Sequence, residues 1–325
     1  MNRLIDLGVL PIRIKGFRGY KPHFSVLFRF GRQRVFGVDT SYSPNVEQFL
    51  LITHAHSDHH GNSAMLSPKS VASEKTAKAL EIRYKRRFTG MTFKTGEVID
   101  IDSVKVHTYT TGHTIGATAF SWENEVGARI LATGDVKDIS RLPKCEVLIT
   151  EANYGDPLNP QCRFEDDTEG FKAAIREGVA FGAYPFGKAQ RAIELLRHFG
   201  YHDEVEMEHE SLELTRQLME GTGPLVCLGE NGGKMGIVPP WYLHRLPDRL
   251  DKFVLTGRGC RPHKRIRISD HLDFNGLVKM VEKCSPEMTI VYHPTGDMPA
   301  KFVRYLNENG FTAISIDEIT NVVFA

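Results

Sequence analysis

Short apolar segments separated by polar and turn residues predict a chain in which strands alternate with helices. Continuous apolar segments, typical of buried strands, occupy residues 50–52, 128–132, 147–150 and 289–292. Further strands are predicted at residues 12–14, 23–30, 34–38, 98–101, 104–108, 179–183, 224–228, 253–257 and 266–268. Helices are predicted at residues 73–87, 167–177, 186–198, 208–219 and 274–283. This alternation indicates the α/β fold class.

Metal-binding side chains are concentrated directly after the apolar segment at residues 50–52. His54, His56, Asp58 and His59 lie within six residues of one another, in the loop at the carboxyl end of that strand. Loops at this edge of an α/β sheet commonly carry the chemistry. Imidazole nitrogens and carboxylate oxygens together suit zinc, manganese or iron. A structural polar loop is the alternative, but three histidines and an aspartate so close together favour a metal site.

Composition narrows the classes of partner. The 325 residues include 41 basic and 40 acidic ones, so the chain as a whole has no strong field for a polyanion, and any nucleic-acid binding must use local patches. Apolar segments are too short to span a membrane, and the N-terminus does not read as a signal peptide. Five scattered cysteines without a Cys-x-x-Cys pair favour reduced thiols in a cytoplasm.

The His-x-His-x-Asp-His sequence at residues 54–59 resembles the signature loop of the metallo-β-lactamase superfamily of binuclear hydrolases. Other motifs of that superfamily appear in the same order, namely an aspartate that ends a strand, Gly-His, Thr-Gly-Asp and a late histidine, here Asp39, His113, Asp135 and His293. The resemblance implies that His54, His56 and His113 hold one metal. It also implies that Asp58, His59 and His293 hold a second metal, that Asp135 bridges the two, and that Asp39 orients the histidine loop.

A second resemblance is to the β-CASP group of nucleic-acid-processing enzymes within that superfamily. Glu151 opens an acidic Glu-Ala-Asn-Tyr-Gly-Asp-Pro segment, residues 187–191 are similar to a Gly-Arg-x-Gln helix start, and His271 and His293 resemble the two C-terminal histidines. One departure is Pro-Thr-Gly after His293, where the group usually has glycine directly. The implied fold is a metallo-β-lactamase αββα sandwich with an inserted α/β cap. Its expected limits are residues 1–155 and 263–325 for the core and 156–262 for the cap.

The resemblance also implies roles in catalysis. Two divalent ions, zinc in preference to manganese or iron, would provide a bridging hydroxide, and Asp58 would serve as both ligand and catalytic residue. His271, paired with Glu151, would protonate the leaving oxygen, because a carboxylate partner favours the imidazolium and fixes its tautomer. Phosphate contacts are expected from cations at a helix start and in a later basic segment: Lys188, Arg191, Arg261, Lys264 and Arg265.

The function expected from these features is hydrolysis of phosphodiester bonds in single-stranded nucleic acid. In the β-CASP group a histidine at the last motif goes with RNA-processing members, so the resemblance implies RNA over DNA through His293. The compact cap resembles that of exonucleases in the group, which implies exonucleolytic cleavage. A DNA-repair exonuclease of the same group is the main alternative. A small-molecule metallo-hydrolase, such as a lactonase or thioesterase, needs no cap and ranks lower, as does a non-catalytic nucleic-acid-binding subunit. No membrane partner is expected, and the sequence leaves a homodimer open.

Overall fold

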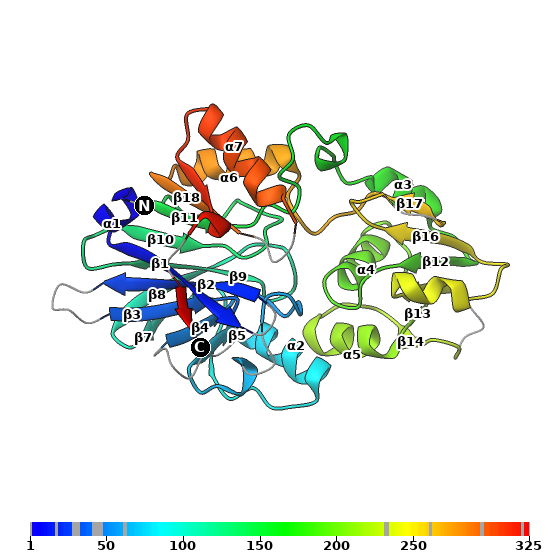
Figure 1. The fold of residues 1–325 in the computed structure, drawn as a ribbon. Coiled ribbons are helices and arrows are strands. Elements are labelled where there is room, and N and C mark those ends of the chain that lie inside the picture. Colours follow the sequence, from blue (N-terminus) through cyan, green and yellow to red (C-terminus); the bar gives the residue numbers. More distant parts are fainter. Residues whose placement is uncertain are drawn as a thin grey trace. The chain divides into compact units, whose positions relative to one another are not determined.

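The computed structural model describes residues 2–16, 19–27, 33–40, 48–60, 64–230, 234–259, 262–292, 296–319 and 322–324. The chain forms two compact units. Unit 1 comprises Met1–Glu81, Lys85–Cys162 and His271–Ala325, and unit 2 comprises Ile82–Tyr84 and Arg163–Asp270. Unit 2 is therefore an insertion in the chain of unit 1, and it begins and ends several residues later than the expected limits of 156 and 262. In Figure 1 unit 2 runs from green to yellow.

Two sheets form unit 1, each with seven strands in the described part of the chain. The first has the order β20 (Val322–Phe324), β1 (Val9–Gly16), β2 (Gly19–Leu27), β3 (Gln33–Val38), β4 (Gln48–Ile52), β5 (Ser70–Ser73), β6 (Met91–Phe93). The second has the order β19 (Ala313–Ser315), β18 (Met288–Val291), β11 (Val147–Thr150), β10 (Arg129–Ala132), β9 (Thr118–Glu123), β8 (Val104–Thr110), β7 (Val98–Ile101). Both sheets mix parallel and antiparallel pairs.

Helical segments complete unit 1. They are α1 (Asn2–Asp6), η1 (Ala64–Leu66), α2 (Glu74–Tyr84), η2 (Pro160–Cys162), α6 (Phe274–Cys284), α7 (Met298–Glu308) and η4 (Ile316–Glu318), with the last three residues of α2 grouped with unit 2. Among the described residues, no helix has the length and apolar character needed to cross a membrane.

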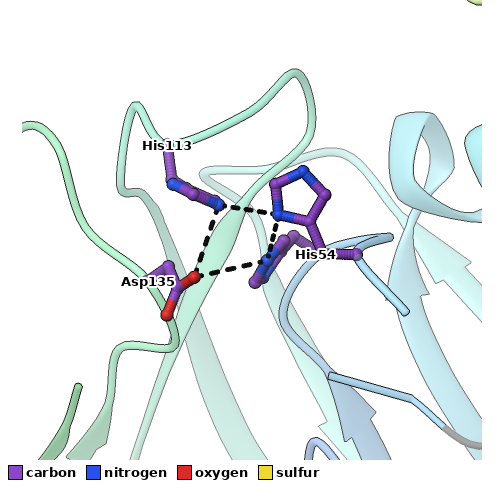
Figure 2. A group of neighbouring side chains, drawn as sticks. His54, His113 and Asp135 are labelled. Carbon is purple, nitrogen blue, oxygen red and sulfur yellow. Dashed lines mark hydrogen bonds and ion pairs between the residues drawn. The ribbon is translucent and has the colours of Figure 1, made fainter. Parts of the chain in front are cut away.

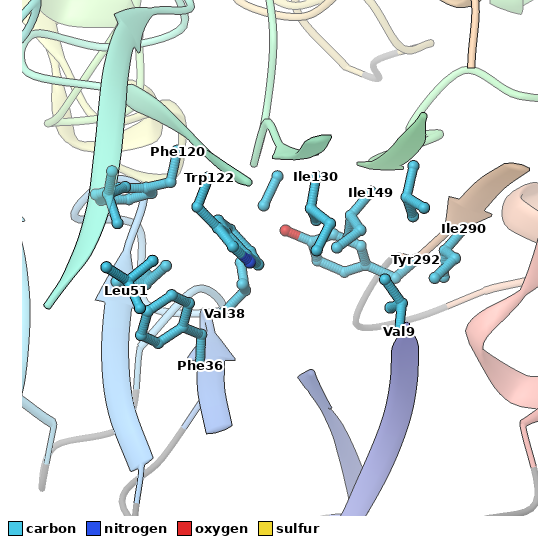
Figure 3. Packing of buried hydrophobic residues seen from close by; sticks show 14 of the residues in the cluster. Val9, Phe36, Val38, Leu51, Phe120, Trp122, Ile130, Ile149, Ile290 and Tyr292 are labelled. Atoms are coloured by element: carbon cyan, nitrogen blue, oxygen red, sulfur yellow. The ribbon is translucent and has the colours of Figure 1, made fainter. Parts of the chain in front are cut away.

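One hydrophobic cluster contains residues from both sheets of unit 1 (Figure 3). Phe36 of β3 meets Trp122 of β9 edge to face, with ring centroids 5.1 Å apart, and Phe93 of β6 meets Phe120 of β9 at 5.6 Å. Such aromatic pairs add to the free energy gained from burying their area. The core fixes the two sheets against each other, and so fixes the loops that follow their strands.

Unit 2 is built on a sheet in which every strand pair of the described residues is parallel. Its described strands have the order β14 (Leu225–Cys227), β13 (Val205–Met207), β15 (Met235–Val238), β12 (Val179–Gly182), β16 (Asp251–Leu255), β17 (Lys264–Ile266). Helix α3 (Thr168–Ala174) precedes β12, and helices α4 (Lys188–His198) and α5 (His209–Leu218) and the 3-10 helix η3 (Pro240–Arg245) connect later strands. A separate apolar cluster, with Phe171, Phe181 and Ile193 among its buried members, forms the core of unit 2.

Most predicted elements are present, but several end elsewhere. The helix expected to reach residue 87 ends at Tyr84, because Lys85 takes a left-handed conformation at φ 52° and the Glu81 carboxylate accepts the Phe88 amide. The strand expected at residues 266–268 lies at Lys264–Ile266. Part of the strand expected at residues 23–30, with the turn after it, falls outside the described residues.

Candidate metal centre

The predicted ligands lie in loops that follow strands of both sheets of unit 1. His54, His56, Asp58 and His59 follow β4, and Asp135 follows β10. β4 is fully apolar in its last three residues and pairs in parallel with β3 and β5, while β10 pairs in parallel with β11. Within each sheet, parallel strands direct their carboxyl ends to one edge. The Thr118 amide at the start of β9 donates to Thr53 O at 2.9 Å, which joins the loop after β4 to the second sheet. His113 joins them from the loop between β8 and β9.

Four of these side chains surround a single point (Figure 2). His56 Nδ1 lies 3.1 Å from both His54 Nε2 and His113 Nε2. Asp135 Oδ2 lies 3.7 Å from His54 Nε2 and 3.5 Å from His113 Nε2. Ligands of a tetrahedral zinc ion at roughly 2.0–2.1 Å stand about 3.3–3.4 Å apart, so the four measured separations bracket the spacing that a metal requires.

Buried atoms without hydrogen-bond partners point to the same conclusion. Among the described residues, Asp135 Oδ1 is inaccessible to solvent and has no hydrogen-bond partner, and the equally buried His59 Nε2 makes no hydrogen bond and faces Asp135 Oδ2 at 3.4 Å. An unmade hydrogen bond on a buried polar atom costs about 1–3 kcal/mol, so such atoms in a folded protein call for a ligand. A divalent cation would satisfy an imidazole lone pair and a carboxylate oxygen together. The donor set therefore fits a metal ion.

Asp39 fixes the tautomers of two of these histidines. Its Oδ2 accepts hydrogen bonds from Thr53 Oγ1 at 2.7 Å and from His59 Nδ1 at 2.8 Å, and its Oδ1 accepts the Thr53 amide at 2.8 Å. Because the Thr53 hydroxyl proton is given to Asp39, Thr53 Oγ1 accepts from His54 Nδ1, 3.0 Å away. His54 and His59 thus each carry the proton on Nδ1 and turn Nε2 towards Asp135. This arrangement suits the orienting role expected of Asp39.

The titration of the cluster follows from burial and neighbouring charges. Burial lowers the pKa of His54 well below its usual value, and the nearby His59, His113 and His56 lower it further. Burial also acts to lower the pKa of His59, but Asp135 and Asp39 outweigh it and raise that pKa well above normal. His59 in turn outweighs burial at Asp135 and lowers the pKa of that carboxyl well below its usual range. Asp135 is therefore an anion that a cation would further stabilise.

The second predicted metal site is described in part. His59 Nε2 lies 3.4 Å from Asp135 Oδ2 and 3.8 Å from Asp58 Oδ2, whose side chain is half exposed. These three side chains could face one ion. His293, the remaining ligand expected for this site, lies outside the described residues.

His271 and Glu151, the expected acid pair, lie beside the cluster. Glu151 follows β11, and its Oε1 stands 3.0 Å from His271 Nδ1. Backbone amides of Val136 and Asn153 donate to the two Glu151 oxygens at 3.0 Å each, which holds the buried carboxylate in place. His271 Nδ1 is also 3.7 Å from Asp135 Oδ2, so the pair and the cluster share Asp135 as a neighbour.

The cations expected to bind phosphate are mostly engaged with carboxylates of unit 2. The Lys188 ammonium is buried and pairs with Asp270 at 3.1 Å, and the Arg191 guanidinium pairs with Asp166 at 2.8 Å. Binding a phosphate at either would mean giving up an existing ion pair. Lys264 is exposed and 3.7 Å from Asp251, Arg265 is exposed, and Arg261 lies outside the described residues.

Three residues that position the site were not singled out from the sequence. Thr53 Oγ1 donates to Asp39 and accepts from His54, and so links the two side chains. The Asn153 side-chain amide lies 3.0 Å from His271 Nδ1. The Tyr292 hydroxyl donates to Asp39 at 3.2 Å. Thr53 directly precedes the histidines, and that adjacency could have identified it. Asn153 and Tyr292 carry no spacing signal, since a lone asparagine after a strand is usually a turn residue.

Comparison with known proteins gives a distant relative and a similar fold. No protein-family model matches the sequence. A probable DNA ligase of Opitutus terrae is 25% identical over 303 residues, in an alignment that covers 82% of this chain and 28% of the ligase. The chain thus spans less than a third of that relative. The crystal structure of a protein of unknown function from Enterococcus faecalis V583 superposes with a TM-score of 0.61 at 12% identity, covering 94% of this chain and 96% of the other.

Proposed function

We propose that this protein is a metal-dependent nuclease of the metallo-β-lactamase superfamily, β-CASP group, that hydrolyses phosphodiester bonds in single-stranded nucleic acid. The observation that carries the proposal is the shared position of Asp135. Its Oδ2 lies within 3.7 Å of His54, His113 and His271. The candidate metal ligands and the histidine–carboxylate pair therefore lie next to the same carboxylate oxygen. Hydrolysis of a phosphodiester needs both an activated water and a proton donor at one phosphorus.

The residues divide into metal holders and a proton donor. His54, His56, His113 and Asp135 would hold one divalent ion, and Asp58, His59 and Asp135 would contribute to a second. Bound divalent ions would lower the pKa of a water molecule and offset the charge that develops on phosphorus. Zinc is favoured by the histidine-rich donor set, with manganese and iron as the alternatives.

His271 is the proposed general acid. Because its Nδ1 faces Glu151, its Nε2 is the nitrogen left to carry a proton towards a leaving oxygen. Glu151 is held by two backbone amides and therefore keeps the imidazole ring in one orientation. Departure of the sugar oxygen would take the Nε2 proton, and the Glu151 carboxylate would stabilise the imidazolium before transfer.

Our proposal for DNA or RNA as the substrate rests on the similarity to the probable DNA ligase. Position 293 favoured RNA in the sequence, but that residue lies outside the described part of the chain. The probable DNA ligase supports an enzyme that acts on DNA, and we therefore propose single-stranded DNA as the preferred substrate. Exonucleolytic cleavage remains the expectation from the compact insertion.

The test is a substrate panel at fixed metal concentration. Purified protein with Mn²⁺ or Zn²⁺ is incubated with end-labelled single-stranded DNA and RNA of equal sequence, and with a lactone and a thioester. We expect DNA to be shortened from one end, and RNA to be cleaved more slowly. Equal turnover of both nucleic acids would remove the DNA preference only. Turnover of the lactone or thioester, with both nucleic acids intact, would replace the nuclease by a small-molecule hydrolase.

A further inference from the structure

The sheet of unit 2 contains a point at which its connections diverge. β12 and β15 are neighbours and run parallel. The chain leaves β12 through α4 and reaches β13 on the far side of β15, whereas it leaves β15 through η3 and reaches β16 on the far side of β12. Right-handed crossovers in opposite directions lie on opposite faces of a sheet. A crevice between the two departing loops is the usual ligand site of such sheets.

Two exposed aromatic side chains lie in these departing loops. Tyr184 follows β12 by two residues and is 53% exposed, and Trp241 follows β15 by three residues and is 59% exposed. Their ring centroids are 5.9 Å apart with planes at 54°. Large aromatic residues usually bury most of their area, so two adjacent exposed rings at a sheet's carboxyl edge indicate a binding surface.

The loops that carry the two rings are held firmly. The Ala183 amide donates to Val238 O at 2.8 Å, which extends the pairing of β12 and β15 beyond the strands, and the Ala189 amide donates to Tyr184 O at 3.1 Å. Gly182 lets η3 approach the end of β12, because a Cβ there would stand 2.6 Å from Leu243 Cδ1. The backbone segments that carry the rings are thus held in place, which lowers the entropy lost on binding.

We propose that Tyr184 and Trp241 form a stacking platform for the unpaired bases of a single-stranded nucleic acid. Every base has an aromatic face, so stacking holds a strand without reading its sequence. Exposed His244 and Arg245 end the same 3-10 helix as Trp241. The Arg245 guanidinium stands over the ring of Tyr242, the residue next to Trp241, at 5.0 Å, so a positive charge for the strand's phosphates lies on the same short helix. This inference rests on the proposed function and specifies its substrate as unstacked single strands.

The chain provides its own reporter for the test. It contains two tryptophans, of which Trp122 is 1% exposed in the core of unit 1 and Trp241 is 59% exposed. Metal-free protein in EDTA is titrated with oligo(dT), with an abasic oligomer that has the same number of phosphates, and with dTMP. We expect oligo(dT) to quench part of the emission, the abasic oligomer to quench far less, and Trp241→Leu protein to show no response.

Variants separate stacking from charge. The Tyr184→Ala/Trp241→Ala double variant should bind oligo(dT) about 5- to 100-fold more weakly, with the dependence of the affinity on salt concentration unchanged. The Tyr184→Phe/Trp241→Phe variant should keep the affinity, because its rings still stack. Val98→Ala, which removes an exposed apolar side chain on β7, is the matched control and should bind as the wild type does.

Binding without metal keeps this inference distinct from the nuclease activity. Wild-type affinity in the double alanine variant, or equal quenching by the abasic oligomer, would overturn the platform even if the protein cleaves DNA. Quenching by dTMP at concentrations as low as oligo(dT) requires would overturn it in favour of a nucleotide site. Quenching by oligo(dT) alone, in a protein that cleaves no nucleic acid, would support the platform and count against the nuclease.

Discussion

Asp39 is the residue on which the geometry of the histidine loop depends most. It accepts hydrogen bonds from Thr53, His59 and Tyr292, and through Thr53 it also sets the tautomer of His54. Its backbone has φ 50°, a left-handed conformation that asparagine tolerates as well as aspartate does. Replacing the carboxylate by an amide therefore changes the hydrogen bonding and leaves the backbone in place.

We expect Asp39→Asn to weaken metal binding by about 10- to 100-fold, the usual effect of removing a partner that orients a ligand. Competition with a chromophoric chelator measures the affinity. Asp100→Asn, which alters a carboxylate on β7 outside the cluster, is the control. An unchanged affinity in Asp39→Asn would mean that the histidine tautomers do not depend on Asp39.

The role of His271, as general acid or as metal ligand, can be tested by replacing it. Replacing it by alanine should lower turnover by about 10²- to 10⁴-fold while metal content is unchanged, because a proton donor is lost and the four-residue cluster is intact. Turnover and metal content are measured on the same preparation, with His107→Ala, an exposed histidine of β8, as control. Since Asp135, Glu151 and His271 also stand close enough to share an ion, loss of metal in His271→Ala would reassign it as a ligand.

Metal affinity should depend on pH through His59. In the metal-free protein the pKa of His59 is raised, after Asp135 and Asp39 outweigh burial, so its imidazole holds a second proton at neutral pH. A metal that binds Nε2 must displace that proton, and its affinity should rise by about tenfold per pH unit until the pH exceeds the raised pKa. His54, with a lowered pKa, is already neutral in this range and releases none.

Calorimetry in two buffers with different ionisation enthalpies counts the protons released at pH 7. We expect about one proton per metal for the site that contains His59. A metal affinity that is constant between pH 6 and pH 8 would contradict the assignment of a protonated His59 in the metal-free protein.

At the scale of elements, the loop after β10 must approach the loop after β4 very closely. Gly134 has φ 61°, and a Cβ on it would stand 2.3 Å from Thr53 Oγ1. Only glycine at position 134 lets the two loops approach this closely, because any side chain would push them apart.

Gly134→Ala should therefore destabilise the protein and lose metal affinity. Gly127 is the matched control, since it also has a left-handed backbone, φ 81°, but no heavy atom within 4 Å of an added Cβ. Gly127→Ala should show only the backbone cost, about 1–2 kcal/mol, and Gly134→Ala about 1–3 kcal/mol more. Equal losses in thermal unfolding measurements would show that the approach of the two loops is not tight.

The sequence was informative where apolar segments and motifs were long or dense. The strand at Val147–Thr150 was predicted residue for residue, because four consecutive β-branched or aliphatic residues leave little choice. Short strands such as Val205–Met207 and Met235–Val238 were not predicted, since three or four residues give no period. The α/β class follows from these patterns, whereas the order of strands depends on long-range packing that no local segment encodes.

The candidate site shows the same contrast between dense motifs and isolated residues. Dense histidines predicted a metal site in the loop after β4, and the structure brings His54 and His56 together with two further candidate ligands. Lys188 and Arg191 were expected to bind phosphate, and in the structure they form ion pairs with Asp270 and Asp166. The partner of Lys188 is distant in the sequence, since Asp270 lies 82 residues after it. A charge that is paired across the fold cannot be told from a free one by composition.

At the scale of the whole molecule, unit 2 is inserted between the two parts of unit 1 that carry the candidate centre. Glu151 precedes the insertion and His271 follows it directly, and the two side chains meet at 3.0 Å. The Glu151–His271 pair is therefore completed only when the chain returns from unit 2.

The most direct test measures metal content and DNA cleavage together in Asp135→Asn protein. Asp138→Asn, an exposed aspartate three residues further along the same loop, is the control. We predict that Asp135→Asn loses both bound metal and cleavage of single-stranded DNA, because its Oδ2 faces His54, His59, His113 and His271. Asp138→Asn should keep both. Cleavage at the wild-type rate by an Asp135→Asn protein that holds no metal would contradict the account.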